Sequence, residues 1–162
     1  MTKKKPDFHD ADLILKLYDL RREKVMRESR NAIFGFVPKN YEEMVAVLAP
    51  DHPLNAAFRQ VSSYYEMAYG FARHGTINAE LLAESTVEGL VLYCKVLPFL
   101  PQLRAEYSPF QFQNAEWMTK KTKAYQARMP LVLERVRKMG SPLPETTKPE
   151  KTKLKKALKK KS

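Results

Sequence analysis

The fold is decided by residues 64–94, which read YYEMAYGFARHGTINAELLAESTVEGLVLYC. Apolar residues before Gly75 cover most of the circumference of a helix, as is typical of a helix in the middle of a bundle. Gly75 permits a left-handed stop after His74, and Asn78 is a favourable first cap for a following helix. We therefore predict one helix from Pro53 to His74 and another from Ala79 to about Leu103, kinked or ended near Pro98, and we expect the two to pack as antiparallel neighbours.

The short connection also predicts which residues face each other. If the hairpin folds about the bond between Thr76 and Ile77, Gly70 lies level with Ala83 and Tyr64 lies level with Gly89. Small residues on facing positions would let the two backbones approach, and the glycine would leave room for the tyrosine ring.

The flanking segments also favour helices. Asp10 can cap a helix that runs to about Ile33, with an inward stripe of Leu13, Leu17, Leu20 and Lys24 or Val25. Further helices are expected over 41–49, capped by Asn40, and from about Phe110 to Met139, kinked near Pro130 and stopped by Gly140. The fold class is thus all-α, a single-domain antiparallel helical bundle of about five helices over residues 9–141, with a basic arm at 1–8 and a tail at 142–162.

Length and composition restrict the class of protein. The 162 residues fit one domain, and a hydrophobic fraction of 44% with 29% charged residues is typical of a globular chain. The single cysteine, Cys94, excludes an intramolecular disulfide and agrees with a reducing compartment. Lys95 interrupts the longest apolar run, and acidic residues follow Lys3 to Lys5, so we expect neither a membrane span nor a secretory signal. The expected location is the cytoplasm.

The net charge of +11 comes mostly from the two ends of the chain. Residues 145–162 hold eight lysines and two glutamates, whereas residues 6–144 hold 18 basic and 16 acidic residues. A segment so poor in large apolar groups is expected to be disordered alone. Its lysines are either a solubilising end or a sequence-blind contact for nucleic acid or another polyanion. The lysines in question are Lys151, Lys153, Lys155, Lys156, Lys159, Lys160 and Lys161.

Several motifs occur in a characteristic order. They are LYDLRRE over 17–23, YYE over 64–66, HGTIN over 74–78, Tyr93 with LPF over 97–99, and NAEW over 114–117. From about Leu13 to Arg128 the chain resembles a bacterial family of small all-helical domains of unknown function. The resemblance implies the helical fold, but it implies no particular reaction or ligand.

Few residues are spaced as chemistry requires. The histidines His9, His52 and His74 have no Glu or His at ligand spacing, so no metal and no cofactor is expected. Cys94 is expected to be a buried, inert thiol. The row Glu80, Glu84 and Glu88 is interpreted as a solvated helix face or as partners for Arg59 and Arg73, with a catalytic or cation site as the alternative.

The central hairpin is the one place where a pocket is conceivable. Its candidate residues are Tyr65, Glu66, Tyr69 and Glu84, although an aromatic stripe at helical spacing is more often core. We therefore expect a non-enzymatic binding or adaptor module for a protein partner, whose basic ends contact an acidic surface. The alternatives are a nucleic-acid-associated protein that uses the lysine-rich tail, and a small-ligand pocket or enzyme in the hairpin.

Overall fold

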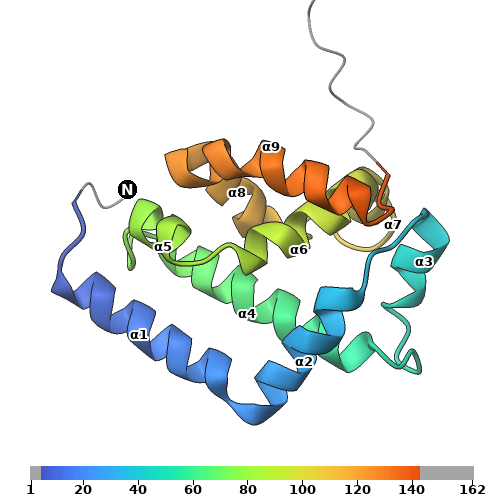
Figure 1. The fold of residues 1–162 in the computed structure, drawn as a ribbon, viewed down its shortest axis with the longest axis horizontal. Helices are drawn as coiled ribbons and strands as arrows, with labels where there is room; N and C mark the ends of the chain where they lie inside the picture. The colour runs from blue at the N-terminus through green and yellow to red at the C-terminus, as the bar shows by residue number, and fades with distance from the viewer. Residues whose placement is uncertain (1–4, 143–162) are drawn as a thin grey trace, which may run out of the picture.

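Helix α4 (Asn55–Arg73) runs through the middle of the molecule, and the other helices pack around it (Figure 1). The computed structural model describes residues 5–142, and within that range every regular element is helical. The predicted all-α class is therefore confirmed. The lysine-rich tail lies outside the described residues.

The turn after α4 forms as the sequence predicts. Gly75 has φ of 77°, a left-handed conformation that favours glycine. Asn78 caps helix α5 (Ala79–Ser85), because its Oδ1 accepts a hydrogen bond of 2.9 Å from the backbone N–H of Leu81. Both helix signals around Gly75 are thus confirmed.

The long helix predicted after Asn78 is wrong, because the chain divides into four shorter pieces. After α5, Thr86 is extended, with φ of −145° and ψ of 145°, and helix α6 (Glu88–Val96) begins two residues later. A 3-10 turn (Leu97–Phe99) and helix α7 (Leu100–Glu106) follow, and each carries a proline in its first turn. Proline is tolerated there because no backbone donor is needed, so Pro98 and Pro101 mark new starts.

The N-terminal helix also begins and divides differently from the prediction. Asp7, rather than Asp10, caps helix α1 (Phe8–Arg22), and helix α2 (Lys24–Gly35) follows an extended Glu23. The carboxylate of Asp10 is fully buried and accepts a hydrogen bond of 2.8 Å from the backbone N–H of Asn78. The predicted inward stripe is wrong at Leu20 and Val25, which are each 56% exposed. The buried side of α1 is formed by Asp10, Ile14 and Leu17, and that of α2 by Met26, Ser29 and Ile33.

The remaining elements are α3 (Tyr41–Ala46), α8 (Gln113–Lys121) and α9 (Lys123–Lys138). Asn40 caps α3, as predicted. The predicted single helix from about Phe110 is wrong, since extended Thr122 separates α8 from α9. Pro130 lies inside α9, and Gly140 follows its end with φ of 102°.

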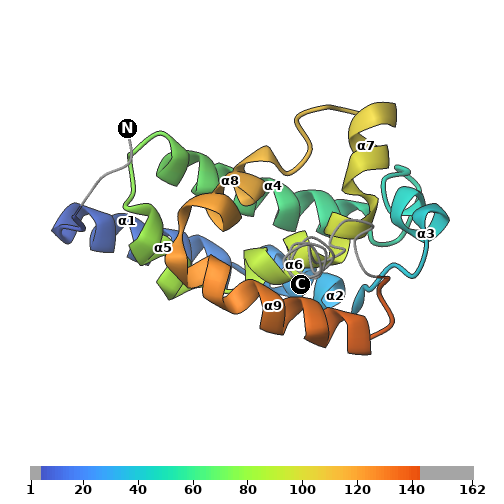
Figure 2. The same ribbon diagram turned by 90° about the horizontal axis from the view of Figure 1, so that it is seen from above.

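The packing brings α2 and α8 against α4, and α6 against α9, as the two ribbon views agree (Figures 1 and 2). A Cβ placed on Gly89 would lie 2.6 Å from Cδ1 of Tyr65 and still closer to Oη of Tyr69. Gly89 thus accommodates tyrosine rings, but the predicted partner Tyr64 is wrong. Gly70 faces Asn114 of α8 and not Ala83. The break after Ser85 changes the register on which the predicted pair of Tyr64 and Gly89 depended.

Candidate functional site

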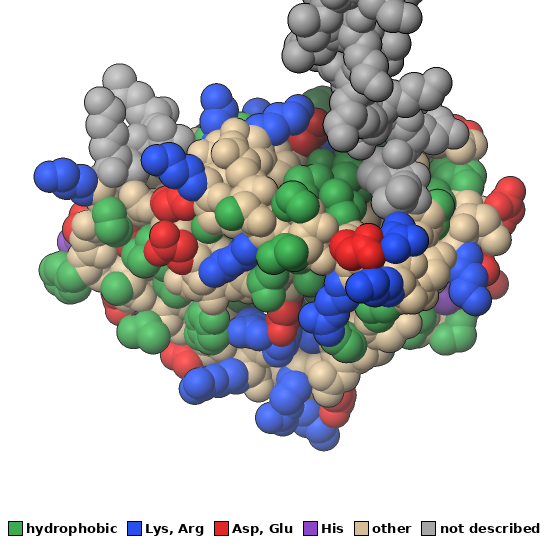
Figure 3. Space-filling model, turned by 45° about the horizontal axis from the view of Figure 1, so that its top comes forward, with side chains coloured by type: hydrophobic (Ala, Val, Ile, Leu, Met, Phe, Trp, Pro, Cys, Tyr) green, Lys and Arg blue, Asp and Glu red, His purple; other side chains and the backbone are tan. Residues whose placement is uncertain are grey.

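A cleft of about 290 Å³ lies between α2, α6 and α9, with part of α4 at its base. Apolar side chains form much of its wall, and a few charged groups lie among them. On the face that Figure 3 shows, lysine and arginine side chains likewise surround exposed apolar ones. The cleft is lined by Arg30, Asn31, Ile33, Phe34, Val61, Tyr65, Val87, Glu88, Val91, Leu92, Lys95 and Arg135.

The carboxylate of Glu88, in the cleft, forms ion pairs with two arginines. Glu88, the first residue of α6, accepts hydrogen bonds from Nε of Arg30 at 2.7 Å, Nε of Arg21 at 3.2 Å and Oη of Tyr65 at 2.7 Å. Desolvation acts to raise the pKa of Glu88, but the bonds from Arg30, Arg21 and Tyr65 outweigh it and lower the pKa to about 2. These contacts tie α1, α2 and α4 to the start of α6.

A buried lysine caps the end of α2 from the other side of the cleft. The side chain of Lys95 is only 2% exposed, and its Nζ donates to the carbonyl oxygens of Ile33 at 3.1 Å and Phe34 at 2.7 Å. These carbonyls lie in the last turn of α2, and that of Ile33 also accepts from the backbone N–H of Phe36. Burial, together with the nearby charge of Arg135, lowers the pKa of Lys95 to about 8.

The exposed ring of Phe34 lies between two cations. The Nζ of Lys95 is 5.6 Å and the guanidinium carbon of Arg135 is 5.7 Å from the ring centroid. Both distances are within cation–π range. Within residues 5–142, Arg135 has no carboxylate close enough for an ion pair. The cleft therefore carries three cations, Arg30, Lys95 and Arg135, against the one carboxylate of Glu88.

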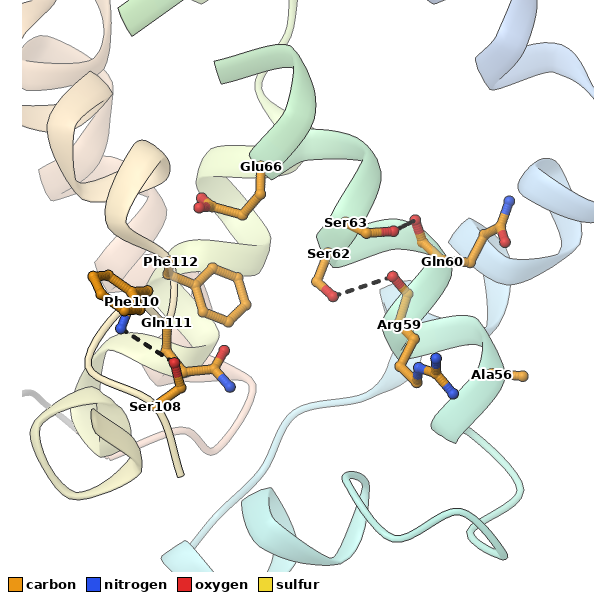
Figure 4. Close-up of a pocket in the computed structure, with 10 residues that line it drawn as sticks. All are labelled: Ala56, Arg59, Gln60, Ser62, Ser63, Glu66, Ser108, Phe110, Gln111 and Phe112. Carbon is orange, nitrogen blue, oxygen red and sulfur yellow. Dashed lines mark hydrogen bonds between the residues drawn. The ribbon is translucent and has the colours of Figure 1, made fainter. Parts of the chain in front are cut away.

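A second, wider groove of about 620 Å³ separates α4 from the loop before α8 (Figure 4). Several of its polar side chains are already engaged. Glu66 accepts from the backbone N–H groups of Asn114 at 3.1 Å and Ala115 at 2.8 Å, which caps α8. The hydroxyls of Ser62 and Ser63 donate to carbonyls of their own helix. Among the described residues that line this groove, Arg59 carries the one charged group that is not already hydrogen-bonded or ion-paired. The groove therefore offers a charged ligand less attraction than the cleft does.

The structure does not bring the four predicted pocket residues together. Tyr65 lines the cleft, whereas Tyr69 is fully buried and hydrogen-bonds Oη of Tyr125 at 2.7 Å. Glu66 lines the separate groove, and Glu84 is exposed on α5.

The acidic row does not form a single face either. Glu80 caps α9 by accepting from the backbone N–H groups of Lys123 at 2.8 Å and Ala124 at 2.7 Å. Glu88 is on the next helix, so the interpretation of all three carboxylates as a solvated face is wrong, and a shared catalytic site is equally unsupported. Glu80 instead joins α5 to α9, and Glu88 joins α6 to α1, α2 and α4.

Other sequence expectations can be placed as well. Cys94 is buried, as predicted, and burial raises the pKa of its thiol to about 12. No group of three potential ligands for a metal occurs in the described part of the chain. No helix between residues 5 and 142 is both long and apolar enough to cross a membrane. The seven tail lysines proposed for anion contact lie outside the range that the structure describes.

Sequence reasoning missed the four basic residues around the cleft, Arg21, Arg30, Lys95 and Arg135. One signal was present, because a lysine inside an apolar helix must find acceptors when that helix is buried. The partners Ile33 and Phe34 are 62 and 61 residues away along the chain. No local spacing rule joins groups so far apart.

The fold and the cleft define a small helical domain with a basic, partly apolar cleft. The chain belongs to a family described as a domain of unknown function (DUF4760), whose model matches residues 6–122. That range covers α1 to α8 and ends where α9 begins, so it includes Arg30, Glu88 and Lys95 but not Arg135. Comparison with curated proteins and with solved structures found no match.

Proposed function

We propose that this protein is a non-catalytic binding module that docks an acidic segment of a partner protein in the cleft between α2, α6 and α9. The observation that carries the proposal is the excess of cations over carboxylates on an apolar wall. Arg30, Lys95 and Arg135 line the cleft, and the one carboxylate, Glu88, is already shared by two arginines. An incoming carboxylate would find favourable charge without displacing an existing partner.

The surroundings of the cleft favour a protein segment over an isolated small anion. Phe34 is 54% and Val87 is 40% exposed, and both continue the apolar wall beyond the cleft. Aromatic and arginine side chains together are characteristic of the centres of protein interfaces. The expected segment therefore combines Asp or Glu with large apolar residues.

The positions of the basic groups are fixed before any partner arrives. Hydrogen bonds from Arg30 to Glu88 and from Lys95 to two backbone carbonyls hold these side chains in place. Pre-ordered side chains lose less conformational entropy on binding. A docking role in the cytoplasm is consistent with these features.

The two alternative functions have less support. An enzyme built on Tyr65, Glu66 and Glu84 would need these groups around one reacting atom, yet they lie on different surfaces. A nucleic-acid contact through the seven tail lysines would not depend on the cleft. Binding of nucleic acid by the tail is therefore one of the outcomes that the experiment below distinguishes.

The test is selection of peptides from a random library by the full chain, compared between two charge-reversed variants. Arg135→Glu changes the cleft, and Arg59→Glu makes the same charge change at an exposed arginine of the wider groove. We expect the parent chain to select peptides rich in Asp or Glu beside large apolar residues. The Arg59→Glu variant should still bind these peptides, and the Arg135→Glu variant should not. Equal retention by both variants would refute docking in the cleft.

A third variant separates the tail from the cleft. In the full chain, the seven lysines Lys151, Lys153, Lys155, Lys156, Lys159, Lys160 and Lys161 are replaced with glutamine. If the cleft is the site, the selected sequences stay the same and only the association rate falls. Loss of all binding, together with capture of any polyanion by the parent chain, would favour the nucleic-acid alternative.

A further inference from the structure

We infer that Lys95 is a reactive lysine whose amine forms an imine with a small carbonyl compound that carries an anionic group. Such a compound would bind in the cleft between α2, α6 and α9. The inference uses the same cleft as the proposed function but does not depend on a protein partner. It assigns a covalent modification site, and the anionic group of the ligand would lie near Arg30 or Arg135.

The position of Lys95 provides the first support. Its side chain is nearly fully buried, yet it lines a cleft that is open to solvent. Within the described residues no carboxylate pairs with it, and its hydrogen-bond partners are the two carbonyl oxygens of Ile33 and Phe34. A lysine amine becomes nucleophilic when it is desolvated or placed beside another cation. Both conditions hold, because Arg135 shares the Phe34 ring with Lys95.

A neutral amine at Lys95 can keep both of its hydrogen bonds. An uncharged amine has two N–H groups, which match the two carbonyl acceptors of α2, and one lone pair that these bonds leave unused. The lowered pKa of about 8 means that at about pH 7 the neutral fraction exceeds that of an ordinary lysine about 200-fold.

The reaction is balanced without any redox partner. The ammonium releases a proton to solvent, and the nitrogen lone pair adds to the carbonyl carbon of the ligand. Water then leaves, so a C=N bond replaces the C=O bond. The amine and the carbonyl compound thus yield an imine and one water. A nearby guanidinium would stabilise the anionic group of the ligand throughout.

The experiment uses the purified full chain, glyoxylate as an anionic aldehyde, and cyanoborohydride to trap the imine by hydride reduction. Acetaldehyde serves as a neutral aldehyde, and the modified positions are identified by peptide mass spectrometry. At about pH 7 we expect glyoxylate to modify Lys95 at least about tenfold faster than exposed lysines such as Lys16 and Lys138. Acetaldehyde should show a smaller preference, because it lacks the anionic group.

Two variants and one control complete the test. Arg135→Gln should reduce the modification by glyoxylate and leave that by acetaldehyde nearly unchanged, whereas the matched Arg59→Gln should change neither. Unfolding the chain in denaturant should remove the preference for Lys95.

Modification spread over exposed lysines with Lys95 untouched would overturn the inference, as would equal labelling of Lys95 in folded and unfolded chains. Either result would leave the peptide selection by Arg135→Glu unaffected. The failure of this inference is thus distinguishable from the failure of the proposed function.

Discussion

Replacing Gly89 with alanine tests the packing on which the central helices depend. The added methyl would lie 2.6 Å from Cδ1 and 2.8 Å from Cγ of Tyr65, and closer still to Oη of Tyr69. Neither ring can retreat easily. Tyr65 is 4% and Tyr69 is 0% exposed, and Oη of Tyr69 is hydrogen-bonded to Oη of Tyr125.

The expected magnitude follows from three contributions. Overpacking of a dense core costs about 1–3 kcal/mol. Weakening of the Tyr69–Tyr125 hydrogen bond costs about 1 kcal/mol more. Alanine regains about 1 kcal/mol through its better helix propensity. We therefore expect Gly89→Ala to lower the free energy of unfolding by about 2 kcal/mol.

The assay is denaturant unfolding followed by circular dichroism, with Gly35→Ala as the matched control. Gly35 is the last residue of α2, and no atom lies within 4 Å of a Cβ placed there. The control should therefore leave stability unchanged or raise it slightly. If Gly89→Ala is as stable as the parent chain, the close approach of α6 to the two tyrosines is refuted.

Three further predictions concern the charged groups and the thiol. Glu88→Gln should lower the free energy of unfolding by about 2 kcal/mol, a value discounted for partial exposure, while Glu134→Gln in an exposed ion pair should have little effect. Folding lowers the pKa of Glu88 from 4.5 to about 2, so the stability that its charge contributes is fully present above pH 4.5 and is lost as the pH falls toward 2. The free energy of unfolding of Glu88→Gln should therefore fall less steeply with decreasing pH than that of the parent chain. Glu80→Ala should cost about 1 kcal/mol in thermal or chemical unfolding through loss of the α9 cap, whereas Glu84→Ala, exposed on the same helix, should be neutral. Cys94 should react with a thiol reagent only after unfolding, and rapid labelling of the native chain would contradict its burial.

The sequence identified the local signals of the fold well. Asn40, Gly75, Asn78 and Gly140 mark ends of helices as predicted, because capping and left-handed conformations depend on one or two neighbouring residues. The helix lengths were overestimated, since Glu23, Thr86 and Thr122 adopt extended conformations inside segments with helical periodicity. None of these three positions is a proline or a glycine, so no residue that commonly ends a helix marks these breaks in the sequence.

The candidate site was much less predictable. Tyr65, a candidate from the central helix, lines the cleft, but its partner Glu88 was assigned to a row with Glu80 and Glu84 that the break after Ser85 disperses. Arg135 reaches the cleft from α9, whose position relative to α2 depends on every intervening turn. Spacing along the chain identifies neighbours on one helix and cannot identify partners on different helices.

The interruption between α5 and α6 is maintained by groups from distant helices, and it creates the site. The backbone carbonyls freed there are each supplied with a donor. Tyr125 donates to Thr86 at 3.0 Å and Arg128 to Ala83 at 2.6 Å, both from α9, while Tyr18 of α1 donates to Ser85. An unbroken helix would satisfy those carbonyls itself and leave the three side chains without their acceptors.

The same interruption lets Glu88 begin a new helix and reach Arg21 and Arg30, instead of continuing the exposed row of Glu80 and Glu84. Tertiary hydrogen bonds therefore outweigh a continuous helical periodicity at this point. The break and the basic cleft are linked through α9, because this helix donates hydrogen bonds from Tyr125 and Arg128 to the break and also places Arg135 in the cleft.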